Sequence, residues 1–582
     1  MSLPLRDYFQ LLERYLRPQG RLVGLLAFCI FAGIGFQLWL PQIVRSFIDI
    51  AQQGAATSVL LQTGVIYLVA TLINQAVRLG AAYVTEDVKW RATNWLRNDL
   101  SAHCMALDMR FHHEHTPGSM IERIDTDVNK LSEFFSQFVL RLFANGLLMV
   151  GVLVMLSLED WHVGLAFALF ALITFAILMS TVRLGAHYFV QERAASADLY
   201  GGLEEWLAGT EDIRANGGVA YVLDRMQRFI YKVYITSRRA YAMGTLNWGI
   251  TSLLFALSLA LALGLGVWYM HAGVMTIGTV YLIVSYSNTL QRPVTQLARQ
   301  FQDMQAATAS IIRIRELFAL EPTVKSAATP ERLPTGALSV RFDEVSFGYA
   351  DDTPVLREVD FDLEAGKVLG LLGRTGSGKT TITRMLFRFY DPSSGEIELG
   401  GHDLRALDLN DVRRSVGMVT QDVQLFQASV RDNLTFFDHT IPDEKIIDAL
   451  HTLGLTRWYE SLEHGLDTRL EAGGRSLSAG EAQLLAFTRV FLKDPGLVIL
   501  DEASSRLDPV TEHLIEEAID HLLAGRTAII VAHRLATVQR ADKILVLGDG
   551  QVLEFGDRIA LLANPNSRFS QLMRTGMAEV LV

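Results

Sequence analysis

The chain has 582 residues, of which 50% are hydrophobic and 20% are charged, and its formal net charge is −11. This length is too great for a single domain, and the acidic balance argues against nucleic-acid binding as the main function. The sequence contains two cysteines, so a disulfide framework is not expected. The first 20 residues lack the basic-then-apolar order of a cleaved signal peptide.

The first part of the chain contains repeated uncharged apolar stretches that are long enough to cross a bilayer. About 20 helical residues span the hydrocarbon layer. The uncharged stretch Ala240–Gln291 must therefore hold two spans, with a turn near His271–Thr276. The sequence predicts a transmembrane domain over residues 1–320 with six spans, at about 22–44, 57–77, 139–158, 161–182, 246–270 and 276–296.

The positions of Lys and Arg predict how these spans are oriented. Residues 78–141 and 183–239 carry eight Lys and Arg each, whereas the opposite connections carry almost none. The positive-inside rule places both termini and these two long connections in the cytosol of a multi-pass protein of the plasma or inner membrane. Both connections have helical character on their flanks, so we expect spans two to five to continue as helices into the cytosol.

Two groups of polar residues in this part admit more than one interpretation. Arg78, Arg141 and Arg183 are either a lining for an anionic substrate or ordinary residues of the inner interface. Their distance from the outer ends of the spans favours the interface. The segment His112–His115 has the residue types of a metal site, but no second group of ligands accompanies it, so metal binding is the less favoured alternative.

The clearest motif follows a proline-containing linker, residues 321–336, at the start of a second domain over residues 337–582. After the apolar predicted strand Val368–Leu372, the chain fits the pattern Gly-x-x-x-x-Gly-Lys-Thr and continues into a predicted helix. Such a loop surrounds phosphate oxygens with backbone N–H groups at a helix N-terminus. The predicted nucleotide-binding loop consists of Gly373, Arg374, Thr375, Gly376, Ser377, Gly378, Lys379 and Thr380. Lys379 is expected to reach the β- and γ-phosphates of ATP, and the Thr380 hydroxyl to bind Mg²⁺.

Polar residues at the ends of other apolar strands supply the remaining chemistry of ATP hydrolysis. Parallel strands in an open α/β sheet place ligands at their carboxyl ends. Asp501, after Leu497–Leu500, is expected to hold Mg²⁺, and the adjacent Glu502 is the candidate general base. Gln421 is expected to contact Mg²⁺ and the attacking water, and His533 to contact the γ-phosphate.

Taken together, these motifs resemble those of the ATP-binding cassette exporter superfamily, and the match covers nearly the whole chain. The resemblance implies that Tyr349 stacks on adenine, and that the signature Leu477-Ser-Ala-Gly-Glu481 contacts the γ-phosphate bound to a second subunit through Ser478 and Gly480. It also implies that the segment Ser505–Asp508 crosses the dimer, with Asp508 near the nucleotide, and that the cytosolic turns are coupling helices. The expected fold is therefore a membrane protein with an all-α six-helix domain fused to an α/β P-loop NTPase domain.

Two departures from the family pattern concern the signature, which usually reads Leu-Ser-Gly-Gly-Gln. Ala479 replaces a glycine, and Glu481 replaces glutamine and puts negative charge near phosphate. An intact Glu502 beside an altered signature indicates one subunit of a heterodimer, with a homodimer as the alternative.

The predicted function is ATP-driven export of an amphiphilic substrate, or lipid flipping. An ATP-gated channel or a regulatory receptor on the same scaffold is the alternative, and a peptide is the alternative substrate.

Overall fold

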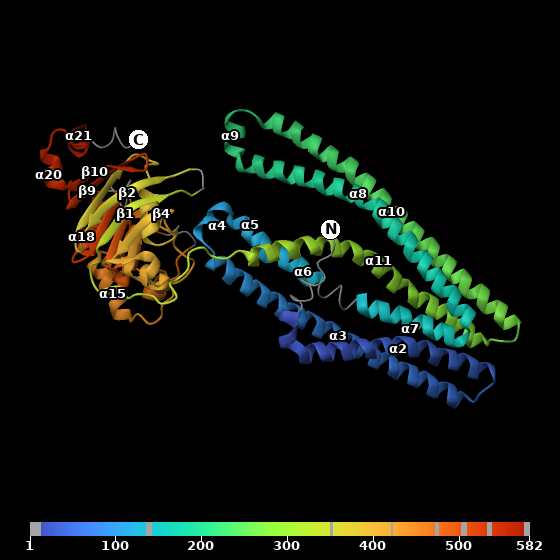
Figure 1. The fold of residues 1–582 in the computed structure, drawn as a ribbon. Helices are drawn as coiled ribbons and strands as arrows, with labels where there is room; N and C mark the ends of the chain where they lie inside the picture. The colour runs from blue at the N-terminus through green and yellow to red at the C-terminus, as the bar shows by residue number, and fades with distance from the viewer. Residues whose placement is uncertain are drawn as a thin grey trace. The chain divides into compact units, whose positions relative to one another are not determined.

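The computed structural model describes residues 13–134, 142–349, 353–420, 423–471, 477–501, 509–531 and 538–575, with the backbone alone at 134, 298–307, 509 and 510. The chain forms two compact units. The membrane unit comprises Met1–Met105 and Pro117–Leu320, and the nucleotide unit comprises Ala106–Thr116 and Glu321–Val582. Figure 1 labels the elements of both units.

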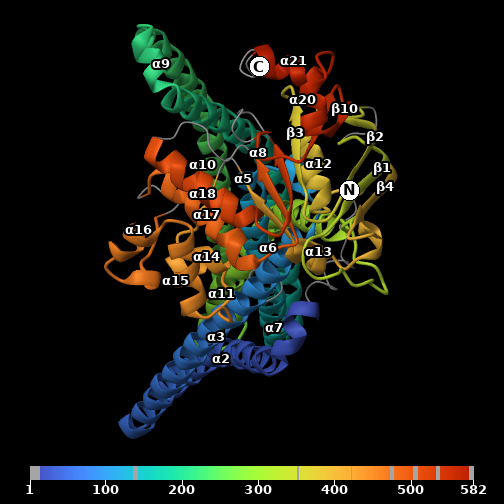
Figure 2. The same ribbon diagram turned by 90° about the vertical axis from the view of Figure 1, so that its left-hand side faces the viewer.

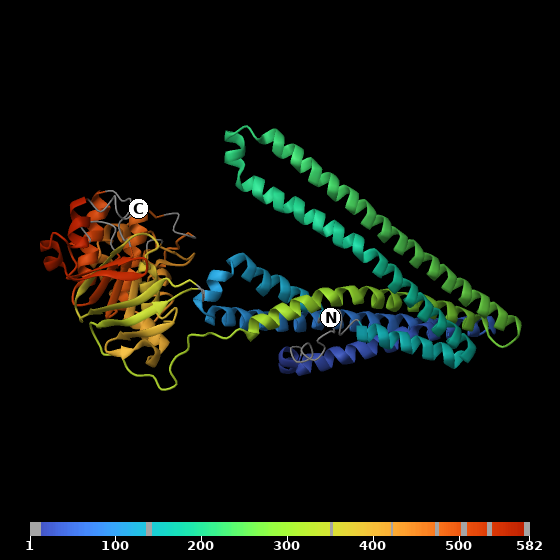
Figure 3. The same cartoon turned by 45° about the horizontal axis from the view of Figure 1, so that its top comes forward.

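The membrane unit is built from long helices. Helices α8 and α10 lie side by side and are joined at one end by the short helix α9 (Figure 3). The helices of this unit are α2 (Gly20–Gln52), α3 (Thr57–Ala106), α5 (Pro117–Ile121), α6 (Val128–Phe134), α7 (Phe143–Glu159), α8 (Trp161–Ala208), α9 (Thr210–Ala215), α10 (Val219–His271) and α11 (Ile277–Ala319), with η1 (Arg17–Gln19) before α2 and a π-helical segment, η2 (Glu122–Asp127), before α6.

Helix α11 packs against α2, α7, α8 and α10, and therefore lies inside this bundle. Within the described residues, α2 with its N-terminal extension, α3, α8 and α10 are long and apolar enough to cross a membrane, and α7 is a shorter apolar helix. Helix α11, which holds the predicted sixth span, does not reach that apolarity because it carries polar residues between Ser285 and Gln291. Ser287 and Tyr286 are fully buried. A helix surrounded by other helices can carry such residues because they contact protein instead of lipid.

The connection between α7 and α8 shows how local sequence sets a tight turn. The Asp160 carboxylate caps α8 by accepting from the backbone N–H groups of His162 at 2.8 Å and Val163 at 3.4 Å. A Cβ at Gly164 would lie 2.0 Å from Ser157 Oγ. Aspartate at the N-cap and glycine at the crossing therefore let the two helices pack closely within one turn.

The nucleotide unit contains two sheets. A four-stranded antiparallel sheet has the order β2-β1-β4-β5, and a six-stranded sheet has the order β10-β9-β3-β8-β7-β6, in which β9, β3, β8, β7 and β6 are parallel. The strands are β1 (Val340–Phe347), β2 (Leu356–Leu363), β3 (Val368–Gly373), β4 (Ser394–Leu399), β5 (His402–Asp403), β6 (Val416–Val419), β7 (Leu497–Asp501), β8 (Thr527–Val531), β9 (Lys543–Gly548) and β10 (Gln551–Asp557).

Helices pack around the six-stranded sheet, with α17 and α18 on one side and the antiparallel sheet on the other (Figure 2). Every residue of β3 and β8 is buried, as expected for parallel strands covered on both faces. The helices are α4 (Met109–Glu114), α12 (Lys379–Leu386), α13 (Leu409–Ser415), α14 (Val430–Thr435), α15 (Asp443–Thr452), α16 (Thr456–Glu460), α17 (Ala479–Lys493), α18 (Pro509–Leu523), α20 (Arg558–Ala563) and α21 (Arg568–Thr575), with short 3₁₀ turns η4 (Leu404–Ala406) and η5 (Gly465–Asp467).

Candidate functional site

The predicted phosphate loop connects β3 to α12 at the carboxyl edge of the six-stranded sheet. Its glycines at 373, 376 and 378 have φ of +154°, +83° and +106°. A Cβ at Gly378 would lie 2.6 Å from Leu356 Cδ2, and a Cβ at Gly373 would lie 2.4 Å from the Leu547 carbonyl oxygen. Glycine is required at both positions because β2 and β9 leave no room for a side chain.

Two buried polar side chains in this loop show whether it fits a phosphate group. Ser377 is 4% exposed, and its Oγ has no hydrogen-bond partner within the described residues. The Lys379 Nζ donates to the carbonyl oxygens of Gly373 at 2.6 Å and Arg374 at 3.0 Å, which holds the ammonium group inside the loop. A phosphate oxygen would give the Ser377 hydroxyl an acceptor and would form a charge-assisted bond with Lys379. The loop therefore fits the predicted nucleotide.

Strand register places Asp501 at the same edge of the sheet. Leu371 of β3 pairs with Val531 of β8, and Val531 pairs with Asp501 at the end of β7. Because neighbouring strands are about 4.8 Å apart, Asp501 lies roughly 10 Å from β3 across this edge. The Thr380 hydroxyl and the Asp501 carboxylate are hard oxygen ligands of the kind that Mg²⁺ prefers. The other predicted residues of this edge lie outside the described residues, and their roles remain predictions: Gln421, Glu502, Asp508 and His533.

Tyr349, the predicted adenine-stacking residue, follows β1 and is half-buried beside α12. Its hydroxyl is 3.2 Å from Thr381 Oγ1 and accepts from Arg384 Nη1 at 3.3 Å. The rings of Phe347 and Tyr390 pack edge-on against it, with ring centroids at 5.1 and 5.2 Å. These contacts hold the orientation of the Tyr349 ring, and its stacking on adenine remains a prediction.

The altered signature forms the start of α17. The Ser478 hydroxyl accepts from the Glu481 backbone N–H at 3.2 Å, while Glu481 Oε2 is 2.8 Å from both the backbone nitrogen and the Oγ of Ser478. This capping box gives the Glu481 carboxylate a partner within its own chain, in addition to the predicted effect of its charge on phosphate. A Cβ at Gly480 would lie 1.9 Å from Thr511 Cγ2, so this glycine is required by packing against α18. The Ser-x-x-Glu spacing is a local signal that predicts the capping box, but no sequence signal predicts the contact with Thr511.

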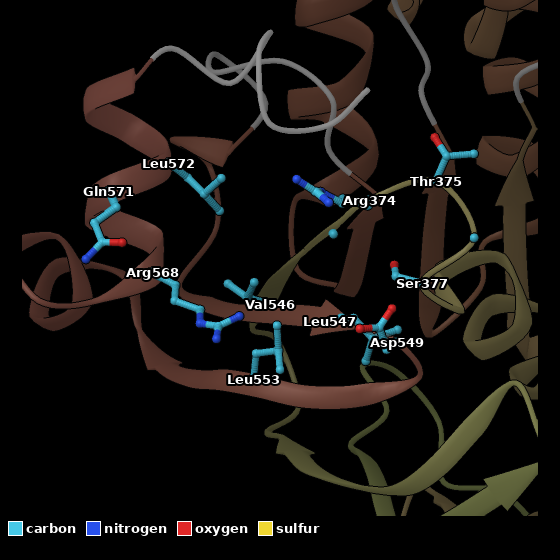
Figure 4. A pocket seen from close by; sticks show the side chains of 13 residues that line it. Arg374, Thr375, Ser377, Val546, Leu547, Asp549, Leu553, Arg568, Gln571 and Leu572 are labelled. Atoms are coloured by element: carbon cyan, nitrogen blue, oxygen red, sulfur yellow. The ribbon is translucent and has the colours of Figure 1, made fainter.

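A cavity of about 660 Å³ borders the phosphate loop on the side of β9. Loop residues 373–377, the end of β9 and helix α21 form its walls (Figure 4). Arg374 enters it from the loop and Arg568 from α21, so the chain places two guanidinium groups beside the predicted phosphate site. Sequence analysis missed Arg568, because it lies far along the chain and belongs to no recognisable motif.

The His112–His115 segment packs against aromatic rings in the nucleotide unit. The ring of His115 stacks on Phe111 at 4.3 Å, and the ring of His113 lies nearly parallel to that of Tyr349 at 6.5 Å. Among the described residues, no group of three or more His, Cys, Asp or Glu side chains is arranged to hold a metal ion. In the membrane unit, Arg78 and Arg183 are exposed, and Arg141 lies outside the described residues.

The fold and the loop define a helical membrane domain fused to a P-loop ATPase, and comparison with known proteins identifies the family. Residues 23–294 match the family model of the ABC transporter transmembrane region, and residues 356–505 match that of the ABC transporter. An ATP-dependent lipid A-core flippase of Alcanivorax borkumensis is 28% identical and aligns over 98% of both chains. A fatty acid ABC transporter ATP-binding/permease protein of Mycobacterium bovis is 30% identical, over 80% of this chain and 74% of its own.

A solved structure of a bacterial Atm1-family ABC exporter with ATP bound shares the fold. It matches with a TM-score of 0.79, covers 97% of this chain and 99% of its own, and is 24% identical. The chain belongs to the ABC transporter family. It is a membrane protein and an ATPase coupled to transport, as its resemblance to the exporter superfamily predicts.

Proposed function

We propose that this protein uses ATP hydrolysis to export an amphiphilic substrate across the cytoplasmic membrane, or to flip a lipid within it, by alternating access. The observation that carries the proposal is the phosphate loop, in which buried Ser377 and Lys379 fit a phosphate group, on a chain that also contains a bundle of long apolar helices. A relative named as a lipid A-core flippase and another named as a fatty acid transporter support a lipid-like substrate.

Each site residue has a role in this proposal. The loop backbone, Ser377 and Lys379 bind the phosphates, and Tyr349 orients the base. Thr380, Asp501 and Gln421 hold Mg²⁺, which neutralises charge on the phosphates when it is bound. Glu502 accepts a proton from the attacking water, while His533 holds that water in line with the γ-phosphate.

The working unit in this proposal is a dimer of half-transporters, because the signature of one subunit covers the nucleotide bound to the other. We favour a heterodimer. The hydrolytic site would combine Lys379, Glu502 and His533 with a regular signature on the partner. Ser478 and Gly480 of this chain would cover a partner site that turns over slowly.

The test is ATPase activity of the purified chain, alone and with its partner subunit, in nanodiscs with a panel of lipids, amphiphilic drugs and peptides. Stimulation by one class above the basal rate identifies the substrate class, and Glu502→Gln provides the inactive control. An ATP-gated channel would instead show ATP-dependent ion conductance with hydrolysis that no compound stimulates, and this outcome would contradict the export proposal.

The proposed orientation, with both termini in the cytosol, has its own test. In a background with Cys29 and Cys104 replaced by alanine, Gly273→Cys is expected to react with an impermeant thiol reagent added outside intact cells. Ser119→Cys is expected to react after permeabilisation alone, because eight Lys and Arg lie in residues 78–141 around it. Labelling of position 119 from outside would reject this orientation.

A further inference from the structure

A threonine inside the membrane unit has a hydroxyl group with no acceptor. Thr174 of α8 is 2% exposed, and its Oγ1 has no hydrogen-bond partner within the described residues. Other threonines of the long helices donate to their own helix: Thr251 Oγ1 lies 2.7 Å from the Asn247 carbonyl oxygen, and Thr289 Oγ1 lies 2.9 Å from that of Ser285. The Thr174 hydroxyl therefore points away from its own backbone, although an unpaired hydroxyl in an apolar interior is strongly unfavourable.

This hydroxyl faces a small cavity between α8, α10 and α11. The cavity has a volume of about 20 Å³ and is lined by Thr174, Ser258, Ser287 and Gln291, together with apolar side chains. Ser258 is 4% exposed and Ser287 is fully buried, and their Oγ atoms are 2.7 Å apart. A hydroxyl has one hydrogen and two lone pairs, so this serine pair still offers one donor and several acceptor positions.

We propose that this cavity is a hydration site that holds one buried water molecule, which bridges Thr174 to the pair of serine hydroxyls. A cavity needs about 10–15 Å³ of this kind of volume, and 2–4 polar partners, to hold one water. The cavity meets the first requirement, and the three hydroxyl groups that line it meet the second. It is too small for a larger ligand.

The depth of the site makes a bridging water consequential. Thr174, Ser258 and Ser287 lie within three residues of the centres of the predicted spans 161–182, 246–270 and 276–296. At that depth no bulk water is available to satisfy polar groups, so the bridge is the means by which all three helices satisfy these hydroxyls. The contact of α8 with α10 and α11 at mid-membrane is then hydrogen-bonded through water.

The substitution Thr174→Val distinguishes a wet cavity from a dry one by the sign of its effect. Valine has nearly the shape of threonine but no hydroxyl. In a wet cavity it removes one partner of the bound water, and we expect the melting temperature of the full-length protein in nanodiscs to fall by about 1–3 °C. In a dry cavity it removes an unsatisfied hydroxyl, and the melting temperature would rise. Thr251→Val is the matched control, because that hydroxyl bonds within its own helix and not to a neighbouring helix.

The second measurement is a cryo-electron microscopy map of the same protein at a resolution that shows ordered waters elsewhere in the chain. We expect a density peak within hydrogen-bond distance of Thr174 Oγ1 and of the serine pair, absent in Thr174→Val and retained in Thr174→Ser. An empty cavity in such a map rejects the proposal. A higher melting temperature for Thr174→Val than for Thr251→Val also rejects it.

Discussion

The two units differ in how far apart in the sequence their interacting polar groups lie. In the nucleotide unit, Lys379 bonds to the carbonyl oxygen of Gly373, and Ser478 bonds to Glu481. In the membrane unit, Arg45 of α2 pairs with Glu159 of α7, and the Asp49 carboxylate accepts from the Gly278 N–H at 3.0 Å. Interactions over a few residues form recognisable motifs, whereas interactions over hundreds of residues leave no local pattern. Chemistry is therefore easier to predict in the nucleotide unit than in the membrane unit.

The strongest challenge to this comparison is Glu502→Gln, because the role of Glu502 rests on sequence alone. We expect the rate of ATP hydrolysis to fall about 10²–10⁴-fold with ATP binding retained, since the amide keeps the shape of the side chain but cannot accept the proton. Steady-state ATPase assays and binding of a fluorescent ATP analogue measure the two effects. Glu517→Gln, on the exposed face of α18, is the control and is expected to hydrolyse ATP normally. Near-normal hydrolysis by Glu502→Gln would show that another group is the base.

Gly480→Ala tests whether long-range packing also shapes the signature. The new Cβ would meet Thr511 at 1.9 Å, and we expect the free energy of unfolding to fall by about 1–3 kcal/mol. Ala479→Gly, at the exposed neighbouring position, is the matched control and should lower it by about 0.5–1 kcal/mol through backbone entropy alone. Thermal unfolding of both full-length variants measures the difference. Equal melting temperatures would mean that Thr511 adjusts without strain.

Asp127→Asn tests the long-range contacts of the membrane unit. Asp127 is 1% exposed; burial raises the pKa of its carboxyl, but hydrogen bonds from Arg313 at 2.7 Å and Ser310 at 2.9 Å outweigh burial and lower the pKa. Because the Arg313 side chain is 40% exposed, solvent screens the pair, and we expect the variant to lose about 1–3 kcal/mol at pH 7.

The pH dependence of this variant has a definite sign. A lowered pKa means that the carboxylate stabilises the folded protein above the unfolded pKa, which is about 3.9, and that this stabilisation is lost as pH falls through the folded pKa. The wild type should therefore approach the stability of Asp127→Asn in acid. Melting temperatures of both proteins between pH 7 and pH 4 measure this convergence, and a constant difference would contradict the ion-pair explanation.

The smallest effect is expected for Ala479→Gly combined with Glu481→Gln, which restores the usual signature. In the proposed heterodimer, the site covered by this signature is limited by the partner's missing base, so ATPase activity should change less than about twofold, well under the effect expected for losing a catalytic base. Glutamine also completes a capping box, so α17 keeps its N-terminal cap. The companion measurement is ATPase activity of this chain expressed alone. A stable homodimer with vigorous, substrate-stimulated hydrolysis would reject the heterodimer.

The sequence by itself determined the family, the α/β class of the nucleotide unit and the position of the phosphate loop. These depend on contiguous residues, since the glycines, Lys379 and the apolar strand before them act through neighbouring backbone. Only the tertiary structure brought Arg568 to the cavity beside that loop, placed Thr511 against Gly480, and made α11 an interior helix that carries polar residues. The same packing left the Thr174 hydroxyl facing the serine pair. Such contacts depend on which faces of distant helices meet, and that is decided by the packing of the whole chain.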